Sequence, residues 1–64
     1  MKLEEVLPAL REGKRIRRKP WALAAMHVRN QGGDVALFAG DVRQRGAPVI
    51  EQDEVLAQDW EVLP

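Results

Sequence analysis

Residues 13–21, which read GKRIRRKPW, mark the point where the sequence changes from a helical to an extended pattern. Alternate residues of a strand face opposite sides of a sheet. A strand here would place Lys14, Ile16 and Arg18 on one face and Arg15, Arg17 and Lys19 on the other. Proline cannot donate a backbone N–H to a sheet, so the strand is predicted to end at Pro20. The stretch therefore predicts a short strand in which one apolar residue, Ile16, is surrounded by basic ones.

The segment before this strand has the spacing of an amphipathic helix. Its apolar residues recur at intervals of three and four, which places them on one buried side of a helix. They are Leu3, Val6, Leu7 and Leu10. Gly13 is suited to end the helix, and Arg11 suits the negative end of the helix dipole. Pro8 removes one hydrogen bond inside the helix and is predicted to bend it.

The segment after the strand predicts an antiparallel hairpin. We expect a strand from Ala22 to Arg29 and a return strand from Asp34 to Ala39. The sequence Asn30-Gln31-Gly32-Gly33 between them forms a turn readily, because asparagine and glycine accept a positive φ. A turn at Gly40-Asp41 leads to a fourth short strand, from Val42 to Arg45.

The C-terminal segment predicts a short helical turn followed by a last strand. Residues 53–58 can form one or two helical turns with Asp53 as N-cap and with Val55 and Leu56 facing inward. Residues 59–62 alternate polar and apolar, as a strand does. The expected fold is α+β, with an N-terminal helix packed on a small antiparallel β-sheet, in a single domain that spans residues 1–64.

The composition excludes most covalent catalysis. The chain has no Cys and no Tyr, and its sequence also contains no Ser and no Thr. It therefore lacks the hydroxyl and thiol groups that serve as nucleophiles. His27 is the only histidine, and without cysteine the chain offers no cluster typical of a transition-metal site. We expect a protein that is not an enzyme and uses neither a metal nor a cofactor.

The small size favours self-association. A chain of about 60 residues buries only ~60% of the surface of its unfolded state, so its stabilising margin is small. Disulfides are excluded and a metal is not expected, so we expect a homo-oligomer, a dimer or a tetramer. No apolar run approaches the ~20 residues of a membrane span, and no signal-peptide pattern opens the sequence. We therefore expect a cytoplasmic protein.

The charges are separated along the chain although they sum to zero. Ten Lys and Arg balance ten Asp and Glu. The basic groups are concentrated in residues 1–19, and residues 50–64 contain acidic groups only. Domains that bind nucleic acid usually have a pI above ~9, whereas the pI of this chain is about 6.6. A small anionic ligand is therefore a better candidate than nucleic acid.

The basic stretch with Trp21 can be interpreted in two ways. Arginine binds phosphate oxygens with two parallel hydrogen bonds, and an indole offers a flat face to a nucleobase. The alternative is a solvated edge strand whose charges prevent aggregation. Trp21 could equally be part of the core.

Three other residues have favoured structural interpretations. The core is favoured for Trp60, and a packed or hydrogen-bonded role for His27. Asp59 could accept a hydrogen bond from a ligand hydroxyl. A bond to a backbone N–H or to an arginine of the basic strand is favoured for it.

The two ends of the chain together resemble one protein family. The first block is Leu3-x-x-Val6-Leu7 with Leu10, followed by Gly13-Lys14-x-Ile16-x-Arg18-x-x-Trp21. The second is Asp53-x-x-Leu56-Ala57-x-Asp59-Trp60-Glu61-Val62. Both are similar to segments of the second type of Thoeris anti-defence protein. The resemblance implies a sponge from a phage or prophage, which binds a cyclic ADP-ribose-type or cyclic nucleotide immune signal between subunits of an oligomer without degrading it.

The resemblance also implies where the signal molecule binds. Arg18 and Trp21 match the Arg-x-x-Trp element of the family, and Asp59 and Trp60 match its Asp-Trp element. We expect Trp21 to stack on a base and the basic side chains beside it to meet phosphates. The expected ligand-binding residues are Arg17, Arg18, Lys19, Trp21, Asp59 and Trp60. The alternative function is a small oligomeric module that binds a protein and no nucleotide.

Overall fold

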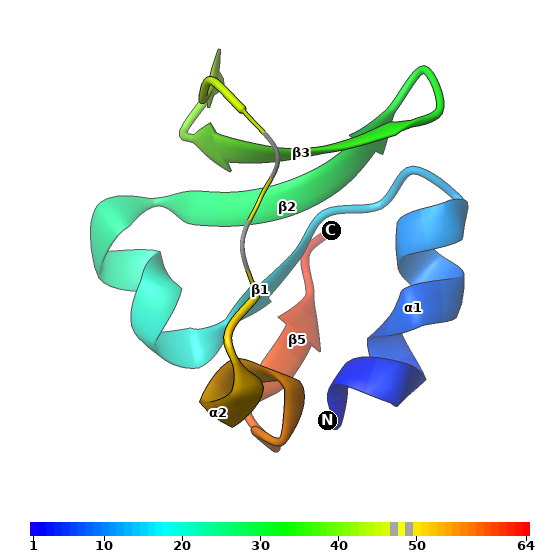
Figure 1. The fold of residues 1–64 in the computed structure, drawn as a ribbon, viewed down its shortest axis with the longest axis vertical. Helices are drawn as coiled ribbons and strands as arrows, with labels where there is room; N and C mark the ends of the chain where they lie inside the picture. Colours follow the sequence, from blue (N-terminus) through cyan, green and yellow to red (C-terminus); the bar gives the residue numbers. More distant parts are fainter. Residues whose placement is uncertain (47, 49) are drawn as a thin grey trace.

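The basic stretch forms the fourth strand in the order of a five-stranded antiparallel sheet. The computed structural model describes residues 1–46, 48 and 50–64. The strands lie in the order β4-β3-β2-β1-β5, with α1 packed beside the sheet and α2 close to the start of β5 (Figure 1). The elements in chain order are α1 (Leu3–Arg11), β1 (Ile16–Arg18), the 3-10 helix η1 (Lys19–Ala24), β2 (Met26–Gln31), β3 (Asp34–Ala39), β4 (Val42–Arg43), α2 (Gln52–Val55) and β5 (Trp60–Val62). The α+β prediction is confirmed.

β1 lies inside the sheet, so the interpretation of the basic stretch as an edge strand is wrong. Ile16 is opposite Val28 of β2 on one side and Val62 of β5 on the other. The edge positions belong to β4 and β5. Strand order depends on pairing between distant segments, so the charge of β1 alone did not indicate its neighbours.

The core lies between α1 and one face of the sheet. It is formed by Val6, Ile16, Val28 and Trp60, which are all buried. The predicted helix is confirmed, with Pro8 inside it and Gly13 after its end at a φ of +87°. A left-handed φ of this kind strains residues that have a Cβ atom, which explains the glycine. Ile16 is fully buried, on the core side of β1.

A 3-10 helix replaces the first half of the predicted second strand. η1 runs from Lys19 to Ala24 and has Pro20 in its first turn, where the fixed φ of proline is compatible with a helix. Ala25 then adopts a left-handed φ of 52° and reverses the chain into β2. The following hairpin is confirmed, with Gly32 and Gly33 at positive φ between Gln31 and Asp34.

The C-terminal helix is shorter than predicted and packs differently. It begins after Glu51, which is its N-cap in place of the predicted Asp53. Val55 and Leu56 do not face inward, because their exposed fractions are 48% and 72%. A single helical turn presents few side chains to the core, and Ala57 packs against the core there. The predicted last strand is confirmed as β5. The fourth strand is shorter than predicted and ends at Arg43.

Within the described residues, the helices are too short and too polar to cross a membrane.

The fold predicts a clear difference between Ile16 and an exposed valine of β4. Ile16→Val removes one methylene from a fully buried side chain, so we expect the free energy of unfolding to fall by about 0.5–1.5 kcal/mol. Val42→Ala removes carbon atoms from a side chain with an exposed fraction of 65% and should change this free energy by less than about 0.5 kcal/mol. Urea unfolding of both variants measures the difference. If both variants lowered the free energy of unfolding equally, the result would contradict the burial of Ile16 in the core.

Candidate functional site

The six predicted ligand-binding residues come from three neighbouring segments and divide between the two faces of the sheet. Arg17 and Arg18 are consecutive in β1, so their side chains lie on opposite faces. Arg18 and Asp59 form one pair, and Trp21 and Trp60 form another next to it. The side chain of Arg17 lies apart from these, and Lys19 is exposed at the start of η1.

Arg18 and Asp59 form a bidentate ion pair. Nε of Arg18 donates to Oδ1 of Asp59 at 2.7 Å, and its terminal NH2 group donates to Oδ2 at 3.0 Å. The pair lowers the pKa of Asp59 and raises that of Arg18, and the hydrogen bond is the largest cause in both cases. The backbone N–H of Lys19 donates to the carbonyl of Asp59. The favoured interpretation of Asp59 as the partner of an arginine is confirmed.

The two tryptophans form an edge-to-face pair with unequal burial. Their ring centroids are 5.2 Å apart and the ring planes are inclined by 77°. Trp60 is fully buried, as predicted, and its Nε1 donates to the carbonyl of Glu54 at 2.8 Å. Trp21 is partly exposed and packs against the core. A buried, hydrogen-bonded indole therefore holds a partly exposed one in a fixed orientation.

Arg17 also has an acidic partner, on the opposite face of the sheet. Its Nε donates to Oε1 of Glu61 on β5 at 3.0 Å, and its terminal NH2 group lies 2.9 Å from the same oxygen. Two of the three basic residues predicted to meet phosphates are thus already paired with carboxylates within the chain.

A polar hollow on this opposite face contains residues that the sequence did not single out. It has a volume of about 210 Å³ and is formed by Arg15, which precedes β1, by β2 and β3 and by the turn after β3. The residues lining it are Arg15, His27, Arg29, Phe38, Gly40 and Asp41. Strand alternation places Arg15 and His27 on one face of their strands, but the register between the strands was needed to bring them together.

His27 is packed, as favoured, and its charge state is set by its surroundings. The ring stacks on Phe38, with centroids 5.2 Å apart and planes inclined by 3°, and only 6% of the residue is exposed. Burial is the largest cause that lowers the pKa of His27 below 6.5, followed by the charges of Arg15 and Arg29. The imidazole is therefore neutral at pH 7.

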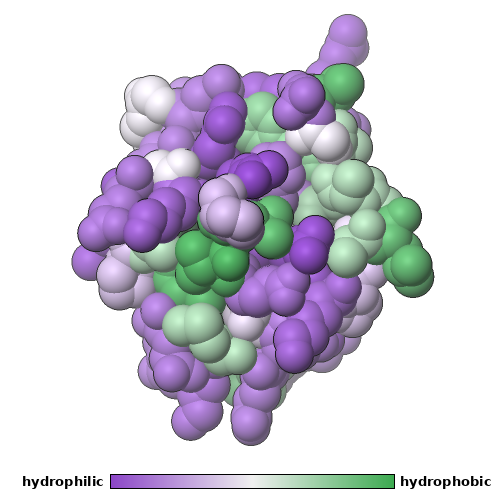
Figure 2. All heavy atoms as spheres, turned by 180° about the vertical axis from the view of Figure 1, so that it is seen from behind, coloured by the Kyte–Doolittle hydropathy of each residue, from purple (hydrophilic) through white to green (hydrophobic). Residues whose placement is uncertain are grey.

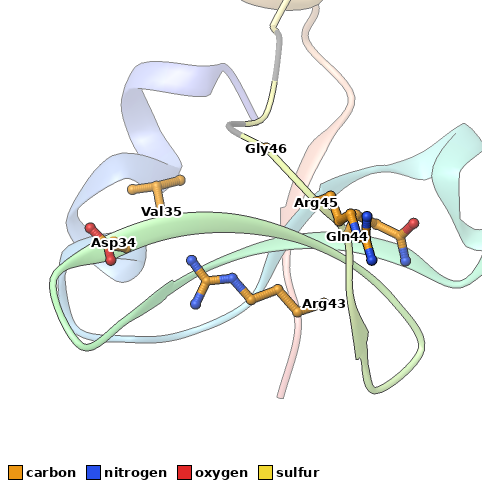
Figure 3. A pocket seen from close by; sticks show the side chains of 6 residues that line it. All are labelled: Asp34, Val35, Arg43, Gln44, Arg45 and Gly46. Carbon is orange, nitrogen blue, oxygen red and sulfur yellow. The ribbon is translucent and has the colours of Figure 1, made fainter.

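A second hollow lies beside β4 and is larger and more open than the first. Its volume is about 550 Å³, and it is lined by Asp34, Val35, Arg43, Gln44, Arg45 and Gly46. In Figure 3, the side chain of Arg43 extends along β3 toward Asp34, whereas Gln44 and Arg45 lie at the other end. Arg43 donates to Gln31 at 3.1 Å. The polar groups do not point toward a common position, so this hollow is a weak candidate for a binding site.

Two apolar areas of the surface are unusual for so small a chain. Leu23, in η1, has an exposed fraction of 98%. Figure 2 shows apolar atoms projecting at the side of the molecule where η1 lies when it is seen from behind. A groove of about 350 Å³ between α1 and α2 is lined by Leu3, Glu4, Leu7, Val55 and Leu56. Exposed apolar areas of this kind are typical of contacts with other proteins.

The arrangement is suited to binding, and the described residues contain no cluster of three acidic or histidine side chains that could hold a metal ion. The groups available to a ligand are an indole face and basic side chains. These groups can stack on a planar ring and bind phosphate oxygens.

A comparison with known families gives one match, which spans almost the whole chain. The model of the Thoeris anti-defense 2-like domain matches residues 1–63. Neither a curated protein nor a solved structure gives a significant match. The resemblance of the two terminal blocks to this family is therefore confirmed.

The ion pair between Arg18 and Asp59 predicts a pH-dependent contribution to stability. The pKa of Asp59 is lowered from 3.8 in the folded protein, so the unfolded chain takes up this proton first on acidification. The contribution is present above pH 3.8 and is lost as the pH falls through the lowered pKa. We expect Asp59→Asn to lower the urea midpoint at neutral pH, and the difference from wild type to shrink below pH 3.8.

Asp34→Asn is the matched control, because Asp34 has no ion-pair partner among the described residues. It should leave the midpoint nearly unchanged. If Asp59→Asn lowered the urea midpoint by the same amount at every pH, the result would contradict the role of the ion pair.

Proposed function

The chain belongs to the Thoeris anti-defense 2-like family, and from this premise we propose that it is a non-enzymatic sponge. The sponge binds a cyclic ADP-ribose-type or cyclic nucleotide immune signal and keeps it from the host's effector. It acts in the cytoplasm of the bacterial host, where such a signal would be available. The partly exposed Trp21, held edge-on by the buried Trp60, is the observation that carries the proposal.

Trp21 is suited to bind the base of such a signal. An indole stacks on any nucleobase, and its orientation here is fixed by Trp60. Lys19, two residues earlier, is exposed and can reach a phosphate. In this proposal Arg18, Asp59 and Trp60 position Trp21 and the chain around it.

The energies favour a pocket formed by two subunits. Nanomolar binding requires about −12 kcal/mol. A base stack contributes about 1–3 kcal/mol, and a hydrogen bond to a charged group contributes about 1.5–3 kcal/mol. Since Arg17 and Arg18 are already paired with Glu61 and Asp59, one subunit offers too few free groups. A second subunit would supply the others.

The surface around η1 supports a contact with a second copy of the chain. The segment from Trp21 to Ala25 is uncharged, and Leu23 projects from it almost fully exposed. A stable interface covers about 800 Å² on each partner, which is nearly a fifth of the 4477 Å² surface of this chain. A second copy seated here would cover Leu23 and enclose Trp21 at the subunit boundary. The proposed assembly is a dimer or a tetramer.

Sequestration without chemical change agrees with the side chains present. The chain contains no Ser, Thr, Cys or Tyr. Within the described residues, the imidazole of His27 stacks on Phe38 and has no carboxylate hydrogen-bonded to orient it. These features support a protein that holds its ligand and returns it intact.

A second candidate function is a small oligomeric module that binds a protein and no nucleotide. The groove between α1 and α2 favours it, because Val55 and Leu56 are exposed there. Under this alternative Trp21 has only a packing role.

The sponge is tested by titration calorimetry with cyclic ADP-ribose isomers and cyclic dinucleotides. We expect at least one of them to bind, and the ligand to be recovered unchanged after the protein is heated. Trp21→Ala removes the stack and should weaken binding by about 1–3 kcal/mol, which is roughly five- to more than a hundredfold. Trp21→Phe is the matched control, because it keeps an aromatic face and should retain most of the affinity.

The outcomes separate the two candidate functions. Loss of binding in Trp21→Ala with an intact oligomer supports the sponge. Dissociation of the oligomer in the same variant supports the packing role. The absence of heat with every ligand, or a chemically altered ligand, would rule out the sponge.

The contact at η1 is tested by native mass spectrometry. Leu23→Asp places a charge in the proposed interface, so we expect the wild-type dimer or tetramer to become a monomer. Val42→Asp places the same charge on β4, at another exposed apolar residue, and should leave the mass of the assembly unchanged. An assembly that survives Leu23→Asp, or a monomeric wild type, would show that the contact is elsewhere or absent.

A further inference from the structure

We propose that the hollow on the open face of the sheet is a binding site for a small phosphoryl anion, of the size of phosphate or pyrophosphate. The hollow is lined by Arg15, His27, Arg29, Phe38, Gly40 and Asp41, and we call it the arginine hollow. It lies on the face opposite to the core against which Trp21 packs. The proposal is therefore independent of the function proposed above.

The two arginines of the hollow come from adjacent strands. Ile16 is opposite Val28, so the antiparallel register places Arg15 next to Arg29. The guanidinium of Arg29 lies over the ring of Phe38, 4.8 Å from its centroid, and has no ion-pair partner among the described residues. Arg15 donates one N–H to the carbonyl of Pro64 and keeps its other donors. Two planar donor groups thus border one polar hollow.

His27 is the second observation that points to a ligand. Only 6% of the surface of His27 is exposed, and its ring lines the hollow. No hydrogen bond among the described residues involves its ring nitrogens, and no fully buried side-chain nitrogen or oxygen there lacks a partner, so these nitrogens are accessible from the hollow. A ring nitrogen that borders the hollow without a partner from the chain is suited to bind a ligand or an ordered water.

The charges around the hollow favour an anion. Burial lowers the pKa of His27 most, and Arg15, just before β1, Arg17 of β1 and Arg29 of β2 lower it further. Asp41, in the turn after β3, raises it. Glu61 neutralises Arg17, and Asp41 offsets only one of the two remaining arginines. One positive charge therefore remains at the hollow, and a bound monovalent phosphate would balance it.

The volume of the arginine hollow and the nitrogens of His27 indicate which class of anion fits. Pockets for drug-sized molecules have volumes of roughly 300–1,000 Å³, whereas the arginine hollow has about 210 Å³. This volume favours a small anion over a whole nucleotide. A neutral imidazole has one N–H donor and one acceptor nitrogen. Phosphate near neutral pH has both a protonated oxygen and charged oxygens, so it can satisfy both nitrogens, whereas sulfate cannot.

The test uses His27 as its own reporter, because the chain has a single histidine. Its imidazole proton signals are followed by NMR during titration with inorganic phosphate, pyrophosphate or sulfate, at constant ionic strength maintained with sodium chloride. We expect a saturable shift with phosphate or pyrophosphate and a weaker one with sulfate. The bound anion should also raise the pKa of His27, because negative charge favours the imidazolium. Trp21 fluorescence should not change.

Two variants separate a site from general attraction to a basic surface. Arg29→Gln removes a donor of the hollow and should weaken phosphate binding by about tenfold or more. Arg11→Gln removes the same charge from α1, away from the hollow, and should leave the affinity within about twofold of the wild type. Arg15→Gln serves as a second test of the hollow if Arg29→Gln does not fold.

The proposal is overturned by any of three results. The first is that the imidazole signals of His27 show no saturable shift. The second is that sulfate and phosphate shift these signals equally. The third is that Arg29→Gln and Arg11→Gln lose the same amount of affinity for phosphate. A change in Trp21 fluorescence that follows the same titration would assign the anion to the other face. Failure of the sponge in calorimetry leaves these NMR outcomes unaffected, so the two proposals are tested separately.

Discussion

The pairing of β1 with β5 is the constraint on which the rest of the structure depends. It joins residues 16–18 to residues 60–62, so the C-terminal strand lies beside β1 and the N-terminus lies near the start of β5 (Figure 1). The N-terminal ammonium of Met1 donates to the carbonyls of Gln58 and Trp60, and the N–H of Trp60 donates to the carbonyl of Met1. The same pairing places an indole in the core and a carboxylate at each face of the sheet. Two of the four buried residues of the core, Ile16 and Trp60, are therefore brought together by the pairing of segments distant in the sequence.

The separation of charge along the chain follows from this pairing. The acidic C-terminal segment lies against the basic strand, so Asp59 and Glu61 each neutralise one arginine of β1, on opposite faces. Other basic residues have no ion-pair partner among the described residues. Among them is Arg29, on β2, which lies over Phe38 in the arginine hollow. The zero net charge of the chain thus conceals a basic area on the open face of the sheet.

The extent to which the sequence predicted the structure depended on the range of the interactions. Local signals were sufficient for α1, for the end of that helix at Gly13 and for the hairpin at Gly32 and Gly33. The sequence favoured an arginine as partner of Asp59, but it could not choose between the arginines, because only the register of β1 against β5 selects Arg18. The run of alanines after Pro20 has no clear period, so η1 was mistaken for a strand. The arginine hollow combines three strands and was invisible to any local pattern.

Burial also decides which of the predicted ligand-binding residues can touch a ligand in a single subunit. Trp60 is fully enclosed, and the guanidinium of Arg18 is held by both oxygens of Asp59. A ligand that displaced Asp59 would have to replace two charged hydrogen bonds before it gained any affinity. A ligand that stacks on Trp21 leaves those bonds in place and uses an indole that is already oriented. The shared Arg-x-x-Trp and Asp-Trp elements therefore make physical sense as one unit, in which three residues hold the fourth. Under the proposed function, the exposed apolar segment next to Trp21 is where a second subunit would add contacts to the ligand.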